Sequence, residues 1–151
     1  MTDYRVKITS PHSKDVKLLT EELYDELELI YEKNIPENFL NENLNMLKFI
    51  LIYSDNKTAV ACGALKHLED KKAEIKRLYV KKEHRGKGLS KIILNELEKL
   101  ARKLKYEKLV LETGNLQPEA LSLYKNSGYT QIDCYGWHAS DPDSVCFEKK
   151  V

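Results

Sequence analysis

The fold of this chain is limited most by one long amphipathic helix that stands between two short apolar segments. The apolar positions of the helix recur at steps of three and four residues: Leu89, Ile93, Leu97, Leu100 and Leu104. Residues 73–80 before it and residues 108–113 after it are predicted to be strands. Two strands joined by a crossover helix lie parallel in one sheet, with a right-handed connection. The unit therefore predicts an α/β fold.

The residues before this unit predict a helix and an antiparallel hairpin. Residues 4–8 alternate in polarity and predict a strand, and Ser13 is placed to cap a helix over residues 14–33. Residues 48–54 and 58–67 are two apolar runs separated by a short polar turn, which predicts a hairpin. Together with the crossover unit, these segments predict a mixed, mostly antiparallel sheet with helices on both faces.

Other segments carry weaker signals. A short helix is expected near residues 37–44. Pro118 suits the first position of a later helix and Gly128 suits its left-handed cap. Two late strands are predicted near residues 130–134 and 144–149. In the strand at 73–80, strict alternation places Ile75, Arg77 and Tyr79 on the face opposite to that of Glu74, Lys76, Leu78 and Val80.

Length and composition favour one domain over residues 1–151. Apolar residues make up 42% and charged residues 32%, which excludes a disordered or collagen-like chain. No apolar run is long enough to span a membrane and no signal peptide is evident, so we expect a cytoplasmic protein. The three cysteines form no CxxC pair, and we expect them to be small, reduced, apolar side chains: Cys62, Cys134 and Cys146.

Charge is distributed unevenly along the chain. The first 45 residues hold 5 Lys and Arg against 10 Asp and Glu, whereas residues 71–108 hold 14 against 5. A basic middle segment could attract a polyanion and an acidic segment a cation. From the charge distribution alone, solvated surface is the preferred interpretation of both. We expect no nucleic-acid partner, because the net charge is +1 and no aromatic residues are interleaved in residues 81–105.

A glycine-bearing loop, Arg85-Gly-Lys-Gly-Leu-Ser90, lies directly between the predicted strand and the long helix. The free N–H groups of a helix N-terminus and the positive end of its dipole favour an anion. Gly86 and Gly88 would let the backbone approach that anion closely. The spacing fits neither GxxxxGK[ST] nor GxGxxG, because one residue separates the glycines and Lys91 occupies the third glycine position. We expect a diphosphate cradle, and a basic turn that only caps the helix is the alternative.

Three segments resemble successive signatures of the GNAT N-acetyltransferases, in the right order and spacing. They are Ala73-Glu-Ile-Lys-Arg-Leu-Tyr-Val80, Arg85-Gly-Lys-Gly-Leu-Ser90 and Ala120-Leu-Ser-Leu-Tyr-Lys-Asn-Ser-Gly-Tyr129. The resemblance implies a GNAT fold whose two central parallel strands splay apart, with acetyl-CoA as co-substrate and no metal. Two positions depart from the family pattern: Glu83 stands where Gln or Arg is usual, and Gln117 where Asn is usual, with Asn115 as a possible substitute.

The resemblance also implies which residues bind the co-substrate. Its diphosphate would lie on the loop and its pantetheine arm would pair with the end of the preceding strand, much as an added strand does. The implied binding residues are Leu78, Tyr79, Val80, Arg85, Gly86, Lys87, Gly88, Leu89, Ser90, Asn115, Gln117 and Tyr124.

Acetyl transfer to an amine requires a base for the ammonium, a stabilised oxyanion and a proton for the leaving thiolate. The resemblance places Glu74 as the base, and burial between strands would raise its pKa toward neutrality. A strand Glu paired with Lys72 or Lys76 is the alternative. The resemblance places Tyr124 as the proton donor to sulfur, and a packed core tyrosine is the alternative. The backbone N–H of Leu78 would meet the oxyanion.

Other reactive side chains fit less well. The cysteines have no basic neighbour in sequence that would activate them, and the four histidines show no metal spacing. Tyr135, Trp137 and His138 lie in the loop between the last two strands, where they could line an acceptor pocket or cover the edge of the core. We expect the second.

The predicted function is therefore transfer of acetyl from acetyl-CoA to a primary amine by direct attack in a ternary complex. The amine would belong to a small molecule or to a protein, and the enzyme would be a monomer or a homodimer. The acidic first helix hints at a cationic acceptor. A catalytically weak acyl-CoA-binding sensor of the same fold is the alternative, and the presence of Glu74 and Tyr124 weighs mildly against it.

Overall fold

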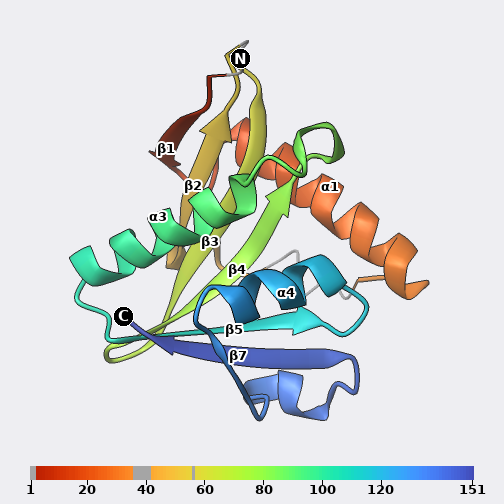
Figure 1. Ribbon diagram of the computed structural model, residues 1–151, viewed down its shortest axis with the longest axis vertical. Coiled ribbons are helices and arrows are strands. Elements are labelled where there is room, and N and C mark those ends of the chain that lie inside the picture. The colour runs from red at the N-terminus through yellow and green to blue at the C-terminus, as the bar shows by residue number, and fades with distance from the viewer. Residues whose placement is uncertain (1–2, 36–41, 56) are drawn as a thin grey trace.

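A sheet of seven strands organises the fold in the computed structural model, which describes residues 3–35, 42–55 and 57–151 (Figure 1). The strands are β1 (Arg5–Thr9), β2 (Leu47–Tyr53), β3 (Ala59–Glu69), β4 (Lys72–Val80), β5 (Lys108–Gly114), β6 (Thr130–Ile132) and β7 (Ser144–Lys150). Their spatial order is β1-β2-β3-β4-β5-β7-β6. Of the pairs formed by these described strands, β4 with β5 is parallel and the others are antiparallel. The predicted mixed, mostly antiparallel sheet is confirmed.

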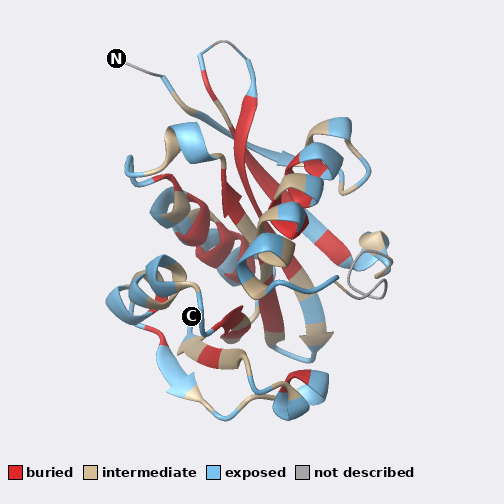
Figure 2. Cartoon of the chain, turned by 90° about the vertical axis from the view of Figure 1, so that its right-hand side faces the viewer, coloured by how far each residue is buried: buried red, intermediate tan, exposed pale blue. Residues whose placement is uncertain are grey.

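Helices cover both faces of the sheet, as predicted. They are α1 (Lys14–Tyr31), α3 (Leu89–Lys103) and α4 (Pro118–Asn126), with short 3-10 helices η1 (Leu44–Met46), η2 (Lys82–His84) and η3 (Gly136–Ser140). The apolar stripe of α3 packs into one core cluster together with Tyr124 of α4. Val16 and Leu19 of α1 pack into a second cluster with Phe49. Buried residues line the inner strands and the sheet-facing sides of the helices (Figure 2).

The first helix begins as its sequence indicates. The Ser13 hydroxyl accepts a hydrogen bond from the Val16 N–H at 3.2 Å, which satisfies one of the free donors of the first turn. The helix ends at Tyr31, two residues before the predicted end, because Glu32 adopts a left-handed conformation with φ of 52°. The short helix expected near residues 37–44 falls largely on residues 36–41, which lie outside the described residues.

Strict alternation along β4 is wrong after Lys76. The pairing with β3 advances two residues from Cys62 to Ala64 but three residues from Lys76 to Tyr79. This extra residue is a β-bulge at which Arg77 has a φ of 55°. Ile75 consequently packs in the same core cluster as Leu78 and Val80, whereas Tyr79 packs in the cluster on the α1 side. The bulge turns the end of β4 relative to its beginning.

The parallel pair separates part-way along its length. The pairing runs from Lys72 with Lys108 to Ile75 with Leu111. Beyond that point β4 continues to Val80 along β3, while β5 continues to Gly114 along β7. The two central strands therefore diverge within the described residues, and Glu112 is the first β5 residue past the last paired position.

The expectation of three reduced cysteines is wrong for two of them. Cys134 and Cys146 form a disulfide, with their Cα atoms 5.1 Å apart. Ile132, two residues before Cys134, pairs with Cys146 across β6 and β7, so the topology brings the two thiols together. Disulfides persist chiefly in oxidising compartments, so the cysteines no longer support the predicted reducing location. Cys62 is free and buried, and burial raises the pKa of its thiol to about 12.

Candidate active site

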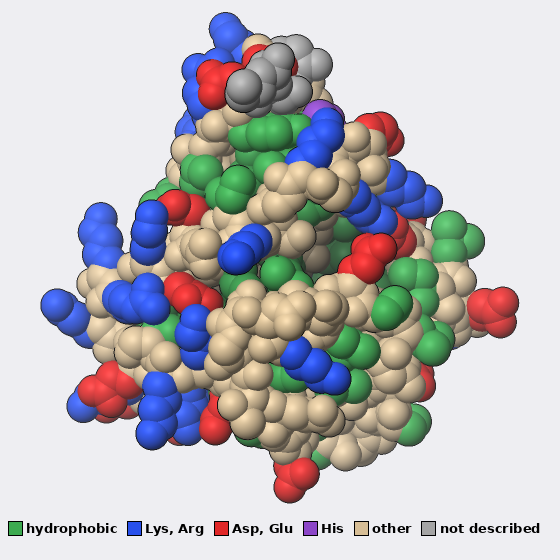
Figure 3. Space-filling model, in the orientation of Figure 1, with side chains coloured by type: hydrophobic (Ala, Val, Ile, Leu, Met, Phe, Trp, Pro, Cys, Tyr) green, Lys and Arg blue, Asp and Glu red, His purple; other side chains and the backbone are tan. Residues whose placement is uncertain are grey.

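A cleft of about 680 Å³ opens where β4 and β5 diverge. Its walls come from α1, β4, β5, η3 and the N-terminal ends of α3 and α4, and one face of the molecule is hollowed there beside hydrophobic and acidic side chains (Figure 3). Eleven of the predicted site residues line it: Glu74, Leu78, Tyr79, Val80, Arg85, Gly86, Gly88, Leu89, Ser90, Gln117 and Tyr124. The fold thus brings together residues from three separate segments of the sequence, within 74–80, 85–90 and 117–124.

The glycine-bearing loop forms one end of the cleft. Gly86 and Gly88 have φ angles of 76° and 78°, a left-handed conformation that L side chains rarely adopt. A Cβ atom at either glycine would meet no atom within 4 Å, so the space above the loop backbone is open. Gly88 precedes the first turn of α3, and Leu89 and Ser90 begin that turn. Lys87 is exposed and lies outside the cleft lining.

Arg85 links this loop to α1. Its Nε donates to the Val80 carbonyl at 2.8 Å, and one terminal nitrogen donates to both carboxylate oxygens of Glu26 at 2.8 and 3.0 Å. The guanidinium also lies 5.5 Å from the centre of the Tyr79 ring. In the structure the Arg85 side chain is therefore committed to the cleft wall, while its backbone belongs to the loop.

Tyr124 enters the cleft from α4. Its ring packs 5.8 Å from that of Tyr129 and 5.9 Å from that of Phe147, which fixes the side chain. Its hydroxyl has no hydrogen-bond partner among the described residues. Burial, and then the charge of Glu112, raise the pKa of the Tyr124 phenol well above its ordinary value. The phenol is thus kept protonated at neutral pH and can donate its proton.

Glu74 is buried as expected, with 4% of its surface exposed, but its pKa moves in the opposite direction from the prediction. Burial alone would raise the pKa of Glu74. The contact with His138, the hydrogen bond from Tyr135 and the nearby charge of Lys76 together outweigh burial, so the net pKa is lowered. The Tyr135 hydroxyl donates to Glu74 Oε2 at 2.5 Å. A carboxylate stabilised in this way is a weaker base than the sequence led us to expect.

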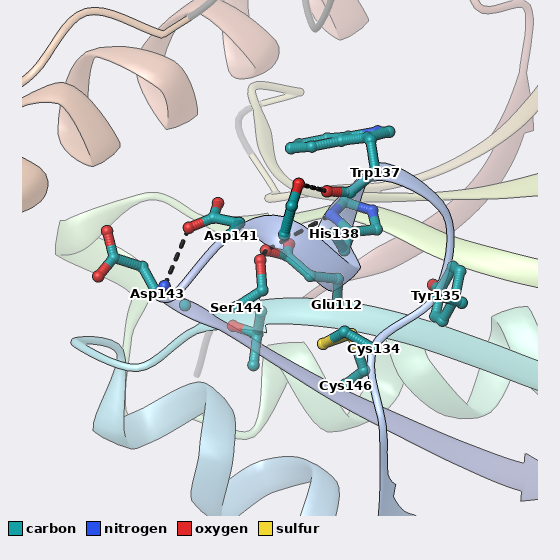
Figure 4. Close-up of polar contacts among 12 residues, drawn as sticks. Glu112, Cys134, Tyr135, Trp137, His138, Asp141, Asp143, Ser144 and Cys146 are labelled. Carbon is teal, nitrogen blue, oxygen red and sulfur yellow. Dashed lines mark hydrogen bonds and ion pairs between the residues drawn. A yellow bond between two sulfur atoms is a disulfide. The ribbon is translucent and has the colours of Figure 1, made fainter.

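Two cleft residues that sequence reasoning did not select lie beside Glu74. His138 Nε2 is 3.8 Å from Glu74 Oε2. On its other side, His138 Nδ1 is 3.8 Å from Glu112 Oε2, and Figure 4 shows these two side chains together. Both His138 and Glu112 line the cleft. The loop between the last strands therefore places His138 in the cleft wall, not merely over the core edge. The Trp137 ring is tilted against the imidazole, with 4.1 Å between ring centres, and Trp137 is half exposed.

Of the two amide residues before α4 that were predicted to bind the co-substrate, one lines the cleft and one does not. Gln117 lines the cleft, and its Oε1 accepts from the Gly114 N–H at 3.0 Å, so its side chain also braces the turn before α4. Asn115 is exposed and lies outside the cleft lining, and its N–H donates to the Asp143 carbonyl at 2.8 Å. Of the two amides considered, only Gln117 is in a position to face a ligand in the cleft.

Comparisons with known proteins agree with this geometry. The profile of the acetyltransferase (GNAT) family matches residues 16–129. This chain belongs to the acetyltransferase (GNAT) family. GNAT acetyltransferases acetylate amine acceptors, and the matched range covers β4, the loop, α3 and α4.

This GNAT chain is also similar to individual proteins of known sequence or structure. It is 36% identical over 92 residues to the uncharacterized N-acetyltransferase YsnE of Bacillus subtilis, a match that spans 60% of this chain and 61% of YsnE. A solved structure from Klebsiella pneumoniae, provisionally described as an acyl-CoA N-acyltransferase, is 30% identical, covers 97% of both chains and superposes with a TM-score of 0.83. A GNAT acetyltransferase from Elizabethkingia anophelis, solved with acetyl-CoA bound, shares the fold with a TM-score of 0.77 and 18% identity over 98% of both chains.

The described part of the GNAT chain offers neither a metal site nor a membrane span. Among the described residues, no group of three or more His, Cys, Asp or Glu side chains is arranged to hold a metal ion. Nor does any described helix have the length and apolar character needed to cross a bilayer.

Proposed function

We propose that this GNAT chain transfers acetyl from acetyl-CoA to a primary amine by direct attack in a ternary complex. The observation that carries the proposal is that the gap between β4 and β5 and the open glycine loop belong to the same cleft. A long ligand with a diphosphate at one end and a reactive group at the other can therefore reach both. Single-domain organisation over residues 1–151 and a monomeric or dimeric state stay predictions.

The residues of the cleft fit acetyl-CoA. The free N–H groups at the start of α3 and the left-handed Gly86 and Gly88 suit a diphosphate. The edge of β4 past Ile75 is not paired with β5 and suits the amide-bearing pantetheine arm. The residues proposed to hold it are Leu78, Tyr79, Val80, the backbone of residues 85–90, and Gln117. When bound, acetyl-CoA supplies an acetyl group activated as a thioester.

Among the residues of this chain, Tyr124 is proposed as the proton donor to the departing sulfur, because its phenol is held protonated and faces the cleft. The Leu78 N–H is proposed to meet the developing oxyanion, since Leu78 lies on the diverging part of β4. Glu74 is proposed to orient Tyr135 and His138 in the cleft wall.

A screen of primary amines tests the proposal. The full chain is incubated with acetyl-CoA and a panel of polyamines, aryl alkyl amines, amino sugars and lysine peptides, and thiol release is followed together with the mass of the product. We expect thiol release to depend on one class of amine and to match the acetylated product. Binding of CoA by calorimetry without turnover on any amine would support the sensor instead, and absence of CoA binding would overturn both.

A further inference from the structure

A buried imidazole, that of His138, lies between two carboxylates at the Glu74 end of the cleft. His138 is 7% exposed, and its Nδ1 has no hydrogen-bond partner among the described residues. The nearest acidic atoms on its two sides are Glu74 Oε2 and Glu112 Oε2, each 3.8 Å away. A buried imidazole that is not fully hydrogen-bonded is unfavourable, so this arrangement calls for a bound group or a mobile proton.

The topology explains why the three side chains meet. Glu74 pairs with Val110 across the parallel strands, so Glu112, two residues further along β5, lies on the same face of the sheet as Glu74. Glu112 pairs in turn with Cys146 of β7, and the disulfide to Cys134 lies next to the chain segment that carries Tyr135 and His138. His138 is thereby held against the point where β4 and β5 begin to diverge.

The two carboxylates are not equivalent. Glu74 accepts a hydrogen bond from Tyr135 at 2.5 Å, has Lys76 at 4.0 Å, and has only 6% of its side chain exposed. Glu112 accepts from the Ser144 hydroxyl at 2.6 Å and has no cationic Lys or Arg partner among the described residues, and 24% of its side chain is exposed. Glu112 is thus the more accessible carboxylate and the less compensated one. Burial raises the pKa of Glu112. At Glu74 the contacts with His138, Tyr135 and Lys76 outweigh burial, and the pKa is lowered.

We propose that Glu112 accepts the proton of the acceptor ammonium in the cleft, and that His138 is the positioning residue that holds the Glu112 carboxylate for this step. The inference rests on the proposed function, which it deepens by assigning the base. The step is a proton transfer: R–NH3⁺ and the Glu112 carboxylate become R–NH2 and the Glu112 carboxylic acid. The nitrogen lone pair is then free to attack, and the proton leaves Glu112 to solvent through the open side of the cleft.

The same cluster favours a cationic acceptor. Glu74 and Glu112 bring two negative charges to one end of the cleft, and Lys76, the nearest Lys to Glu74, is bound to Glu42 at 2.8 Å. An ammonium group entering beside Glu112 would be attracted before it is deprotonated, and would give His138 Nδ1 and Glu112 a group to bind.

The charges around Glu112 decide how the step depends on pH. The titratable groups that act on Glu112 or are acted on by it come from every neighbouring element: Glu74 of β4, Tyr31 of α1, Tyr124 of α4, Tyr135 and His138 of the η3 segment, and Asp141 before β7. The Glu74 and Asp141 charges raise the pKa of Glu112, and His138 and the Ser144 hydrogen bond lower it. Since these groups interact, removing the charge of one changes the titration of the others.

A spectroscopic experiment tests the assignment without an acceptor. Protein labelled with ¹³C at the glutamate side-chain carboxyls is titrated with CoA bound, and Glu112 and Glu74 are assigned from the Glu112→Gln and Glu74→Gln variants. We expect Glu112 to titrate above an ordinary glutamate and Glu74 below it, and the His138 imidazole signals to shift in both variants. Titration of Glu112 at or below Glu74 would overturn the assignment.

A kinetic experiment tests the role. With a primary amine that wild type acetylates, Glu112→Gln should lower kcat/KM about 100-fold at pH 7, the lower end for a lost general base. The loss should shrink as the pH rises toward the pKa of the amine, because free amine then needs no base. His138→Asn should give a smaller loss with a changed pH profile, and Glu112→Asp should recover part of the rate.

The controls separate the possible failures. Glu107→Gln removes an exposed glutamate just before β5 and should leave the pH profile unchanged. Each variant is checked for CoA affinity and for its melting temperature, so a folding defect is visible. Turnover by wild type with an unchanged pH profile in Glu112→Gln would overturn the assignment alone. No turnover by wild type on any amine would overturn the proposed function together with this assignment.

Discussion

The two ends of the cleft are built in opposite ways. The end at α3 is one continuous loop whose backbone is open, with two left-handed glycines and the free donors of a helix N-terminus. The end at β5 is assembled from three distant segments that contribute Glu74, Glu112 and His138. The first end suits an anion through its backbone, and the second suits a cation through its side chains.

This contrast shows how one fold serves two ligands of opposite charge. The diverging strands β4 and β5 separate the two ends and leave a shared space between them. Tyr124 of α4 faces that shared space, and the Glu112 charge contributes to raising its pKa, so the phenol senses the acidic end. Acetyl transfer is therefore expected in the shared space between the two ends, beside Tyr124.

Gly86→Asp should have the largest effect, because it disrupts the end of the cleft at α3 that suits an anion. A Cβ atom there meets no atom within 4 Å, so nothing blocks the side chain, although the φ of 76° strains any residue other than glycine. The added carboxylate faces the proposed diphosphate. Two like charges about 4 Å apart near a protein surface repel by about 4 kcal/mol, which corresponds to about 1000-fold in affinity. Calorimetric titration with CoA measures the loss.

The matched control for this change is Gly128→Asp. Gly128 has the same left-handed conformation, with a φ of 88°, but lies outside the cleft lining next to Lys149. Both variants should lose comparable stability from backbone strain. If Gly128→Asp reduces CoA affinity as much as Gly86→Asp does, strain and not charge is responsible, and the loop is not the diphosphate site.

Removal of the disulfide should be next in size and should act on the opposite end. Cys134 and Cys146 are 12 residues apart in sequence, and closing a loop of that length stabilises a fold by about 3 kcal/mol. Cys134→Ser should lower the free energy of unfolding by about this amount in denaturant titration. Cys62→Ser, which changes a free buried cysteine, is the control, since it alters no cross-link.

The same variant sharpens the comparison between the two ends. Cys134 immediately precedes Tyr135, whose hydroxyl binds Glu74, so loss of the disulfide should disturb the acidic end before the glycine loop. We expect CoA affinity to change little while turnover falls. An equal loss of CoA affinity and turnover would mean that the two ends are not independent.

The sequence predicted the parts of the molecule that are local. The heptad-like spacing of α3, the Ser13 cap and the glycine loop each depend on residues within a few positions of one another. The crossover rule then required the parallel pair of β4 and β5. The alternation along β4 failed at Arg77, because a bulge depends on pairing with β3 and not on the β4 sequence itself.

The acidic end could not be predicted, because it depends on which strands are neighbours. Glu112 and His138 are 26 positions apart, and they meet only because β7 inserts between β5 and β6. One signal was available: Glu112 interrupts the apolar run Leu109–Leu111 just where the strand leaves its parallel partner. The disulfide had no such signal, because the spacing of Cys134 and Cys146 matches no motif.

Tyr124→Phe tests the point where the two ends meet. Removing the phenolic proton should lower kcat about 100-fold and leave KM for acetyl-CoA nearly unchanged, because general acid catalysis acts in the transition state. The ring contacts with Tyr129 and Phe147 survive the change, so the melting temperature should hardly move. Tyr106→Phe, remote from the cleft lining, serves as the control. An unchanged kcat would assign Tyr124 to packing.

Arg85→Lys should have the smallest effect. It should decide whether the Arg85 side chain binds the diphosphate at the α3 end of the cleft or only holds the cleft wall through Val80 and Glu26. Lysine keeps the charge but cannot bind Val80 and both oxygens of Glu26 at once. Because both side chains are partly exposed, the ion pair contributes about 1 kcal/mol or less, so CoA affinity should fall about 5-fold or less. Titration of Arg85→Lys, Glu26→Gln and the double variant with CoA measures the coupling.

Whether Glu26→Gln weakens or strengthens CoA binding distinguishes the two roles of Arg85. If Arg85 shapes the loop by holding α1, as its contacts indicate, Glu26→Gln weakens CoA binding too and the double variant is no worse than either single change. If Arg85 instead contacts the diphosphate, removing Glu26 frees the guanidinium and CoA binds more tightly. Lys81→Gln breaks the single contact between Lys81, which follows β4, and Glu22 of α1. This change should alter CoA affinity less in either case, because one lysine ammonium contact fixes α1 less firmly than the two hydrogen bonds of the Arg85 guanidinium to Glu26.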